Sequence, residues 1–485
     1  MSQPAVSHKM TVKAASLALL KRIHFYIGLF VGPFIFIAAL TGTLYVLTPQ
    51  FENYLYADAL FTSSKGEPQP LSRQIDAAIN VAGENPKIYA VRPAPQAGDT
   101  TRVMFSDPQL GASKSRAIFI DPATLAVKGD MTVYGTSGIL PFRTWLDDLH
   151  RGLLLGDAGR IYSELAASWL WVAAIGGVIL WLIGRRKTRT PRKLSEKVEK
   201  QQRSRRWHST LGLVLMAGLL FFSATGLTWS QWAGDNIGVL RAYMGWLTPA
   251  VNTNLDAQVV AAPADEHADH HAAMADMPDM PGMDMSTHVM PEAPTAVPVM
   301  PHTFDTVVEA ARASGIEANK IEIRPAYTPG KAWTVTEVDR SWPTQVDAVS
   351  VDPATMRIVD HVYFADFPLL AKLTRWGVDA HMGILFGLWN QVILAVFGTG
   401  LCVMIAWGYR LWWLRRNVNI DGVNPAVTLM QTWKSVPLRL QCPIFLITLA
   451  LAISLPVMGI SLVIFLLIDI ARWARSERVL QTARS

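Results

Sequence analysis

Five long apolar segments constrain this chain more than any other feature. They lie at about residues 23–47, 163–184, 208–230, 383–408 and 441–470. A helix of about 20 residues crosses the ~30 Å hydrocarbon core of a bilayer. In keeping with this pattern, 51% of the 485 residues are hydrophobic. We therefore predict a membrane all-α bundle with four clear transmembrane helices and a fifth, ambiguous apolar run.

The first and last runs each allow two readings. Basic residues precede 23–47, as in a signal peptide, but the run is too long and no A-x-A site follows it. We expect an uncleaved helix. The run 441–470 carries Pro456 and Gly459 near its middle and basic residues at both ends. It predicts either a hairpin of short helices or one long fifth helix.

Lys and Arg predict the orientation because they accumulate in cytoplasmic loops. The loop 185–206 is short and densely basic, and Arg410, Arg415 and Arg416 follow the fourth span. The segments expected on the cytoplasmic side are 1–22, 185–206, 409–440 and the basic tail 471–485. The segments expected outside are 48–162 and 231–380. The net charge of +6 follows from this topology and from lipid headgroups, so nucleic-acid binding is not needed to explain it.

Two residue patterns occur twice, which predicts an internal duplication. The first contains Arg22, His24, Gly28 and Thr41-Gly42, and recurs with the same spacing as Arg206, His208, Gly212 and Thr225-Gly226. The second contains Trp145, Asp148, His150 and Gly152, and recurs as Trp376, Asp379, His381 and Gly383. Each half is therefore predicted to consist of a membrane helix, an external domain and a second membrane helix, in that order. An insert at 256–302 accounts for the longer second half.

The two external segments predict small α+β domains. Each starts with a helical pattern, IDAAINVAG or FDTVVEAARASG, and continues with alternating strands. Each reaches a strand that ends in an Asp-Pro turn, at Asp121-Pro122 and at Asp352-Pro353.

Four histidines in equivalent positions predict metal ligands. His24 and His208 lie at the expected cytoplasmic ends of the first and third spans, and His150 and His381 begin the second and fourth spans outside. Ionisable residues at membrane depth are costly and point to function. Topology pairs His24 with His208 and His150 with His381. Each pair suits the two axial positions of a six-coordinate b-type haem, which predicts two non-covalent haems.

The residues beside these histidines each allow more than one interpretation. Asp148 and Asp379 either orient an imidazole, contact a haem propionate or substrate, or cap a helix N-terminus. Gly28, Gly212, Gly152 and Gly383 either admit a flat macrocycle or allow close helix packing. Arg22 and Arg206 either pair with propionates or set the topology. Trp145 and Trp376 form either an electron landing site or interfacial anchors.

Other cofactor chemistries fit less well. The two cysteines, Cys402 and Cys442, both lie in apolar runs, which excludes a disulfide framework and a thiolate metal site, and the absence of CxxCH excludes covalent haem. Zinc needs three or four clustered ligands, whereas each histidine pair offers two.

These motifs, together with the duplicated external domains, resemble the PepSY-associated transmembrane family over nearly the whole chain. The resemblance implies a bacterial inner-membrane protein with PepSY-type periplasmic domains. It also implies a link to iron uptake, since the family includes siderophore reductases with two b-type haems, and makes the four histidines the haem ligands.

The insert departs from that pattern because it is rich in Met and His. Soft thioether and imidazole groups suit copper, so it predicts either an external copper collector or an acidic, Pro-broken linker. The possible copper ligands are His267, His270, His271, Met274, Met277, Met280, Met283, Met285 and His288.

The preferred function is electron transfer across the membrane that reduces a periplasmic ferric siderophore or another metal chelate to Fe(II). No G-x-G-x-x-G unit occurs, so a quinol or a cytoplasmic reductase must donate the electrons. One alternative is a copper-binding or copper-reducing membrane protein. A second is a non-enzymatic inhibitory or sensory protein that uses its PepSY-like domains to bind a partner.

Overall fold

A computed structural model describes residues 12–111, 113–135, 137–185, 196–256, 297–415 and 428–482. The chain divides into two compact units. The first, the helical unit, comprises Met1–Leu44, Asp148–Leu240 and Ile393–Ser485. The second, the sheet unit, comprises Tyr45–Asp147 and Arg241–Val392.

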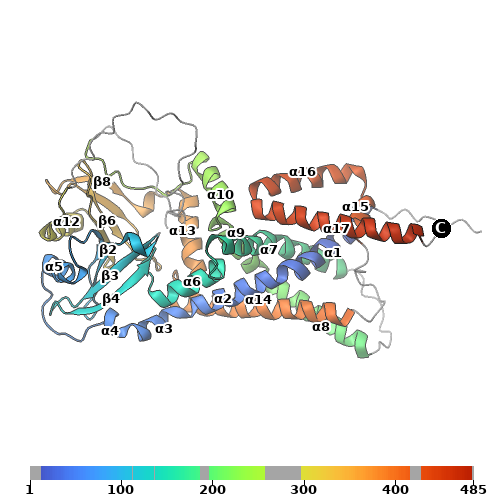
Figure 1. The fold of residues 1–485 in the computed structure, drawn as a ribbon, viewed down its shortest axis with the longest axis horizontal. Helices are drawn as coiled ribbons and strands as arrows, with labels where there is room; N and C mark the ends of the chain where they lie inside the picture. The colour runs from blue at the N-terminus through green and yellow to red at the C-terminus, as the bar shows by residue number, and fades with distance from the viewer. Residues whose placement is uncertain are drawn as a thin grey trace, which may run out of the picture. The chain divides into compact units, whose positions relative to one another are not determined.

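The helical unit is built from apolar helices (Figure 1). Its elements are α1 (Val12–Tyr26), the π-helical turn η1 (Ile27–Val31), α2 (Gly32–Val46), α7 (Gly156–Arg185), α8 (Glu196–Val214), α9 (Met216–Thr228), α10 (Trp232–Tyr243), α14 (Gly387–Arg415), α15 (Leu429–Lys434), α16 (Leu438–Ser454) and α17 (Pro456–Thr482).

Four stretches of helix are long and apolar enough to cross a membrane, counting only residues that the structure describes. They are Val12–Val46, Gly156–Gly184, Gly387–Leu414 and Pro456–Arg475. The helices α8 and α9 pass the same test together but are bent by 59° where they meet. The protein is therefore a multi-pass membrane protein with four or five spans.

The third expected span, 208–230, is the bent one. Helix α8 starts at Glu196, in the segment expected to be a cytoplasmic loop, and the chain turns at Leu215 into α9. Small residues let α9 pack closely on its neighbours. A Cβ on Gly218 would lie 2.1 Å from Phe397, and one on Gly226 would lie 3.2 Å from the Cβ of Ala167. The hydropathy pattern contains neither the bend nor these close contacts.

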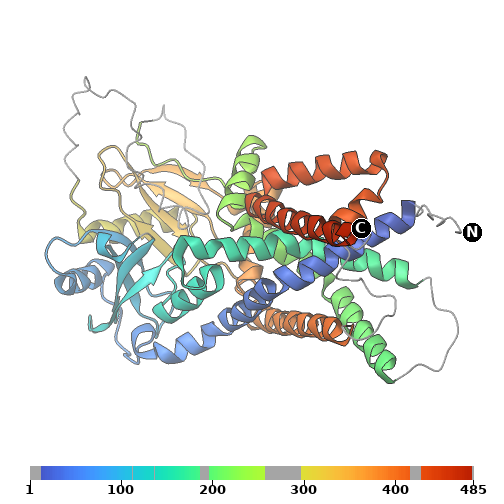
Figure 2. The same cartoon turned by 45° about the vertical axis from the view of Figure 1, so that its right-hand side comes forward.

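The last apolar run is a helical hairpin in which α16 and α17 run back along one another (Figure 2). Leu455 has non-helical dihedrals (φ −122°, ψ 82°), and Pro456 starts the next helix, where its fixed φ is compatible with the first turn. Of the two readings of 441–470, the structure has the hairpin. Its second arm is itself long enough to span a membrane.

The sheet unit contains eight strands and several helices. The strands are β1 (Ile88–Arg92), β2 (Thr101–Ser106), β3 (Lys114–Ile120), β4 (Val127–Tyr134), β5 (Ile321–Arg324), β6 (Trp333–Glu337), β7 (Ala348–Val351) and β8 (Ile358–Val362). The helices are α3 (Thr48–Leu55), α4 (Ala57–Leu60), α5 (Leu71–Ala82), α6 (Pro141–Gly152), α12 (Pro301–Ala313) and α13 (Leu369–His381), with 3₁₀ turns η2 (Pro108–Leu110) and η4 (Phe364–Asp366).

All strands join one antiparallel sheet in the order β4-β3-β2-β1-β5-β6-β7-β8. We expected two separate α+β domains, but β1 pairs with β5, with Val91 opposite Ile323, and unites them. The pairing removes two open sheet edges that would otherwise be exposed. The two Asp-Pro turns have matching backbones, since Leu125 (φ 63°) and Met356 (φ 58°) both adopt the left-handed conformation.

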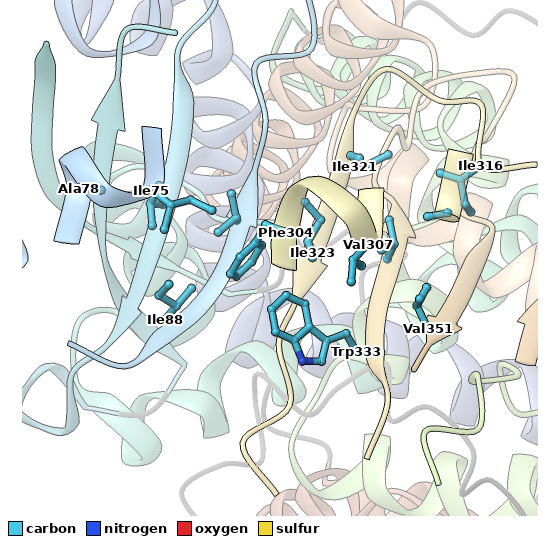
Figure 3. Packing of buried hydrophobic residues seen from close by; sticks show 14 of the residues in the cluster. Ile75, Ala78, Ile88, Phe304, Val307, Ile316, Ile321, Ile323, Trp333 and Val351 are labelled. Carbon is cyan, nitrogen blue, oxygen red and sulfur yellow. The ribbon is translucent and has the colours of Figure 1, made fainter. Parts of the chain in front are cut away.

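Helices α5 and α12 share one core with the sheet (Figure 3). Phe304 and Val307 of α12 lie on one face because they are about one turn apart, as do Ile75 and Ala78 of α5. Strand residues of both halves complete the cluster, among them Ile88, Val91, Ile321, Ile323, Trp333 and Val351. Neither half buries this core alone.

The opposite face of the sheet carries a smaller apolar cluster and a set of charges. In β3, Ile118 and Ile120 belong to the large core, whereas Ala117 and Phe119 belong to the second cluster, as the alternation of strand side chains requires. On the same second face Arg92 donates to Glu322 at 2.7 Å. Polar side chains therefore lie between this face and the chain segments that follow β4.

Candidate functional site

His24 and His208 lie together in the helical unit. His24 is on α1, one turn before the π-helical turn η1, and His208 is on α8. Their ring centroids are 6.4 Å apart and their planes differ by 71°. The pairing predicted from topology is thus present within one compact unit. Single π-helical turns are frequent at functional sites.

The separation of the two rings fits a shared metal ion. Imidazole nitrogens bind metals at about 2 Å, so two rings on one ion have centroids roughly 6 Å apart. The Nδ1 of His208 lies 3.0 Å from the carbonyl oxygen of Met404. If Nδ1 donates this bond, Nε2 has its lone pair available for a metal, the arrangement usual for ligand histidines. The donor set fits a haem iron, which brings its own four equatorial nitrogens.

Glycines of the neighbouring spans pack on both rings, and the sequence analysis missed them. A Cβ on Gly177 of α7 would lie 3.1 Å from Cε1 of His24, and one on Gly408 of α14 would lie 3.4 Å from Cε1 of His208. Of the two glycines predicted here, Gly28 has open space where a Cβ would stand, whereas one on Gly212 would meet Met404 at 3.2 Å. Their positions relative to a macrocycle stay a prediction.

The equivalent arginines Arg22 and Arg206 have different surroundings. Arg22 is 3% exposed and lies over the ring of Tyr26, 5.6 Å from its centroid. Tyr26 donates a hydrogen bond to Asp469 of α17. Arg206 is exposed. Arg22 is therefore buried close to His24, whereas an arginine that only sets the topology would lie at the surface, as Arg206 does.

His150 lies in the short helix α6 and does not begin the second span, as expected from sequence, because α7 starts only at Gly156. Its Nδ1 is 3.0 Å from the hydroxyl of Thr41, which itself donates to the Ile37 carbonyl at 2.8 Å. In the tautomer in which Thr41 keeps that bond, His150 Nδ1 donates to the hydroxyl and Nε2 has its lone pair available. Burial, followed by repulsion from Arg151, lowers the pKa of His150 to about 4, which leaves the ring neutral, as metal ligation requires.

Both residues of the Thr41-Gly42 pair in the first repeat contact the ring of His150. The ring of His150 lies on Gly42, where a Cβ would come 3.0 Å from Cε1. Tyr162 of α7 donates to the backbone carbonyl of His150. Gly152 packs against Gly159 so closely that a Cβ on Gly159 would overlap the Gly152 carbonyl, which supports the helix-packing reading for Gly152. The repeated Thr-Gly signal could have identified Thr41 beforehand.

His381 is the last residue of α13 in the sheet unit, and α14 begins at Gly387. Like His150, it precedes its span instead of beginning it. Asp379 is fully buried and accepts a hydrogen bond from Nε of Arg340 at 2.6 Å. Arg375 lies 3.4 Å from the second oxygen of the same carboxylate. Gly383 adopts φ 76°, which lets the chain turn after α13. The pairing of His381 with His150 stays a prediction.

The other predicted neighbours have ordinary contacts. Asp148 lies eight residues into α6 and 3.7 Å from Arg151, so neither it nor Asp379 is an N-terminal cap. Trp145 is half exposed, in agreement with interfacial anchoring. Trp376 donates to Thr344 at 3.2 Å and packs edge to face on Phe364.

A buried polar cluster in the sheet unit was not predicted. It contains Tyr45 at the end of α2, Glu52 of α3 and Arg143 of α6. The guanidinium carbon of Arg143 is 4.7 Å from the centroid of the Tyr45 ring, and its Nη1 is 3.9 Å from Glu52. Burial raises the pKa of Glu52 to about 7, although attraction to Arg143 and to Arg102 opposes the shift. Hydropathy reasoning missed the cluster because it joins the last turn of the first span, at Tyr45, to residues beyond that span.

Replacing Glu52 with glutamine is expected to stabilise the protein at alkaline pH. A carboxyl whose pKa is higher in the folded state binds more protons there, so the free energy of unfolding falls as pH rises from about 4.5 to about 7. Glu52→Gln removes this loss and should raise the free energy of unfolding by about 3 kcal/mol at pH 8, with little change at pH 4. Denaturant unfolding in detergent at both pH values measures it.

Glu322→Gln provides the control of opposite sign. Burial favours the neutral acid at Glu322, but Arg92 and Arg324 outweigh it and lower the pKa. This variant should lose stability at pH 8, because it removes a carboxylate that two guanidinium groups stabilise. Equal effects of the two substitutions at pH 8 would contradict the assignment of Glu52.

The copper ligands predicted in the insert, from His267 to His288, lie outside the described residues. Among the residues with described positions, no group of three or more His, Cys, Asp or Glu side chains is arranged to hold a metal ion. The copper reading thus depends on the insert alone.

A family model described as a PepSY-associated TM region matches residues 21–415. No curated protein matches the chain. The matched range contains all four predicted histidine ligands and the whole eight-stranded sheet.

Proposed function

The chain belongs to the family defined by the PepSY-associated TM region, and we propose that this multi-pass membrane protein carries electrons across the bacterial inner membrane to an external ferric chelate. The observation that carries the proposal is the His24–His208 pair, with ring centroids 6.4 Å apart between helices α1 and α8. Two imidazoles at this distance could both bind the iron of one haem.

The chain's own residues would hold two b-type haems. His24 and His208 would bind the cytoplasmic-side group, and His150 and His381 would bind the external one, in keeping with an internal duplication. The contact of Thr41 with Nδ1 of His150, and that of the Met404 carbonyl with Nδ1 of His208, would orient the two rings. When bound, haem supplies reversible one-electron chemistry between ferric and ferrous iron. Ile23 and Leu211, neighbours of His24 and His208 on their helices, pack against the apolar core of the helical unit.

The proposed orientation places the sheet unit, with its PepSY-like halves, in the periplasm and the basic ends of the spans in the cytoplasm. A quinol or a cytoplasmic reductase would donate the electrons. The acceptor would be a ferric siderophore, since each electron converts one Fe(III) to Fe(II). Hard oxygen donors bind Fe(II) more weakly, so reduction would release the metal.

Anaerobic reoxidation tests this function. The purified protein is reduced with dithionite, freed of excess reductant, and mixed in separate experiments with a ferric hydroxamate siderophore and with Cu(II). We expect a b-type absorption spectrum and reoxidation by the ferric chelate, with one Fe(II) formed per electron lost. The His24→Ala, His208→Ala double variant should bind less haem and deliver fewer electrons.

Two results would overturn the proposal. Reoxidation by Cu(II) alone would favour the copper-handling alternative. A protein without haem, whose cellular role survives substitution of all four histidines, would favour the non-enzymatic alternative.

A further inference from the structure

Pro33 removes a hydrogen-bond donor from the middle of the first span. In an α-helix the N–H of residue 33 would bond to the carbonyl of Leu29, four residues earlier, but proline has no N–H and its ring crowds that carbonyl. At this place the helix contains the π-helical turn η1, in which the N–H of Gly32 bonds to the carbonyl of Ile27, five residues earlier. The Leu29 carbonyl has therefore lost the donor that an α-helix would give it.

Tyr409 of α14 donates to this carbonyl. Its hydroxyl oxygen lies 2.8 Å from the Leu29 oxygen. The ring has room because Gly32 has no side chain: a Cβ there would lie 3.4 Å from the hydroxyl oxygen and 3.6 Å from Cε2 of the ring. Lipid offers no donor to a carbonyl at membrane depth, so a neighbouring helix has to supply one. A tyrosine on the fourth span thus compensates for a proline in the first.

The other copies of the sequence repeats lack both residues. Ala217 stands at the position of Pro33 in the copy that contains His208, and Val178 stands at the position of Tyr409 in the other copy of the second repeat. Alanine keeps its N–H, so the carbonyl four residues before it needs no donor from another helix, and valine has no donor to give. The hydroxyl therefore occurs only where a proline makes it necessary.

The π-turn decides the direction of His24. A π-turn adds one residue to the helix, which rotates the part before it by about 100° relative to the part after it. His24 lies three residues before the first residue of η1, so its direction from the rest of the first span depends on this turn. In the structure its ring lies beside that of His208, with centroids 6.4 Å apart. Loss of the π-turn would direct His24 away from this partner.

The same stretch of α14 contacts the second histidine. Nδ1 of His208 lies 3.0 Å from the carbonyl oxygen of Met404, and a Cβ on Gly408 would lie 3.4 Å from Cε1 of the ring. Tyr409 is the next residue. Helix α14 therefore contacts the ring of His208 directly and reaches His24 through the π-turn, which lets it set the angle of 71° between the two ring planes.

We propose that Tyr409 is a positioning residue for the haem that His24 and His208 would share. Its hydroxyl holds the π-turn η1 and thereby the direction of His24. The inference rests on the proposed function, since it requires a haem between the two histidines. Tyr409 acts through the backbone of the first span, so its loss changes the geometry of the site without removing a ligand.

The test combines the loss of the hydroxyl with the return of the backbone donor. Tyr409→Phe keeps the ring and removes the hydroxyl, whereas Pro33→Ala gives residue 33 an N–H for the Leu29 carbonyl. The two single variants are compared with their combination. Tyr243→Phe is the control, because Tyr243 is 87% exposed on α10.

Four measurements separate the haem site from the π-turn. All variants are made in a His381→Ala parent, so that the low-spin ferric signal is expected from the His24–His208 haem alone. Electron paramagnetic resonance gives the principal g values of this haem, which depend on the angle between the two imidazole planes. A redox titration gives its midpoint potential, and transfer to a scavenging apoprotein gives its rate of loss. Hydrogen exchange of the amides at 21–36 in haem-free protein reports on the π-turn by itself.

Tyr409→Phe should shift the g values and the midpoint potential while keeping a six-coordinate haem. It should lose haem roughly fivefold faster, and its amides at 21–36 should exchange roughly fivefold faster, because one net hydrogen bond is lost. In Pro33→Ala the carbonyl has a backbone donor, so adding Tyr409→Phe should change these quantities little further. Tyr243→Phe should behave as the parent does.

Unchanged g values and midpoint potential in Tyr409→Phe, with faster exchange, would mean that the tyrosine only stabilises the span and would overturn the inference. So would full additivity of Tyr409→Phe and Pro33→Ala, since the hydroxyl would then act elsewhere than at the Leu29 carbonyl. In both cases the haem bound by the parent would leave the proposed function standing. A parent without haem would overturn the proposed function, and the inference with it.

Discussion

Replacing His208 with alanine is expected to remove about half of the b-type haem that the purified protein binds. The two rings of the His24–His208 pair are 6.4 Å apart, so if they hold a haem as proposed, one iron would use both of them and the loss of either would weaken its binding. The pyridine haemochrome content per protein measures the loss, and electron paramagnetic resonance separates the remaining six-coordinate haem from any five-coordinate residue.

Coupling between the two histidines makes this prediction specific. His24→Ala should have the same effect as His208→Ala, and the double variant should lose no more haem than either single variant, because both act on one site. His302→Ala is the control, since His302 is exposed on α12 of the sheet unit. Independent and additive losses from His24→Ala and His208→Ala would mean that the two histidines serve different sites.

Arg340→Ala is expected to lower the free energy of unfolding by about 3–5 kcal/mol, because it leaves a buried carboxylate without its main partner. Asp379 is fully buried, and Nε of Arg340 donates to it at 2.6 Å. Arg340 also binds the Ser137 hydroxyl and contacts the sulfur of Met382, so it links three segments of the sheet unit. Denaturant unfolding in detergent at pH 7.5 measures the change.

The sequence-equivalent residue offers a matched comparison. Asp148 corresponds to Asp379, but its side chain is 39% exposed and lies 3.7 Å from Arg151. Arg151→Ala should therefore change the free energy of unfolding by only about 0–1 kcal/mol. Adding Asp379→Asn to Arg340→Ala should recover part of the loss, because a neutral amide costs less to bury. If the double variant recovers none of the lost free energy of unfolding, Arg340 stabilises the protein through its other contacts and not through Asp379.

Much of the helical architecture could be predicted from sequence. Apolar runs predicted the spans because a bilayer selects for about 20 hydrophobic residues regardless of what surrounds them. The repeated motifs predicted family membership, which the match over residues 21–415 confirms. The bend at Leu215 could not be predicted, because hydropathy reports the composition of a segment and not the direction of its helix axis.

The local contacts of the histidines could not be predicted from the spacing of the motifs either. Spacing placed His150 at the start of a span, but the left-handed residues Leu153 and Leu154 end α6 before α7 begins. Spacing predicted glycines one turn from each histidine on the same helix. The glycines that touch the rings of His24 and His208, Gly177 and Gly408, come from other helices.

The sequence by itself determined that this chain enters a membrane, which residues repeat, and that His24 and His208 belong together, since hydropathy and spacing are local properties. Only the tertiary structure decided that the two external halves share one sheet and that Asp379 is buried where Asp148 is exposed. It also brought the Tyr409 hydroxyl to the Leu29 carbonyl. These features depend on contacts between segments far apart in the chain, where burial sets the cost of each polar group.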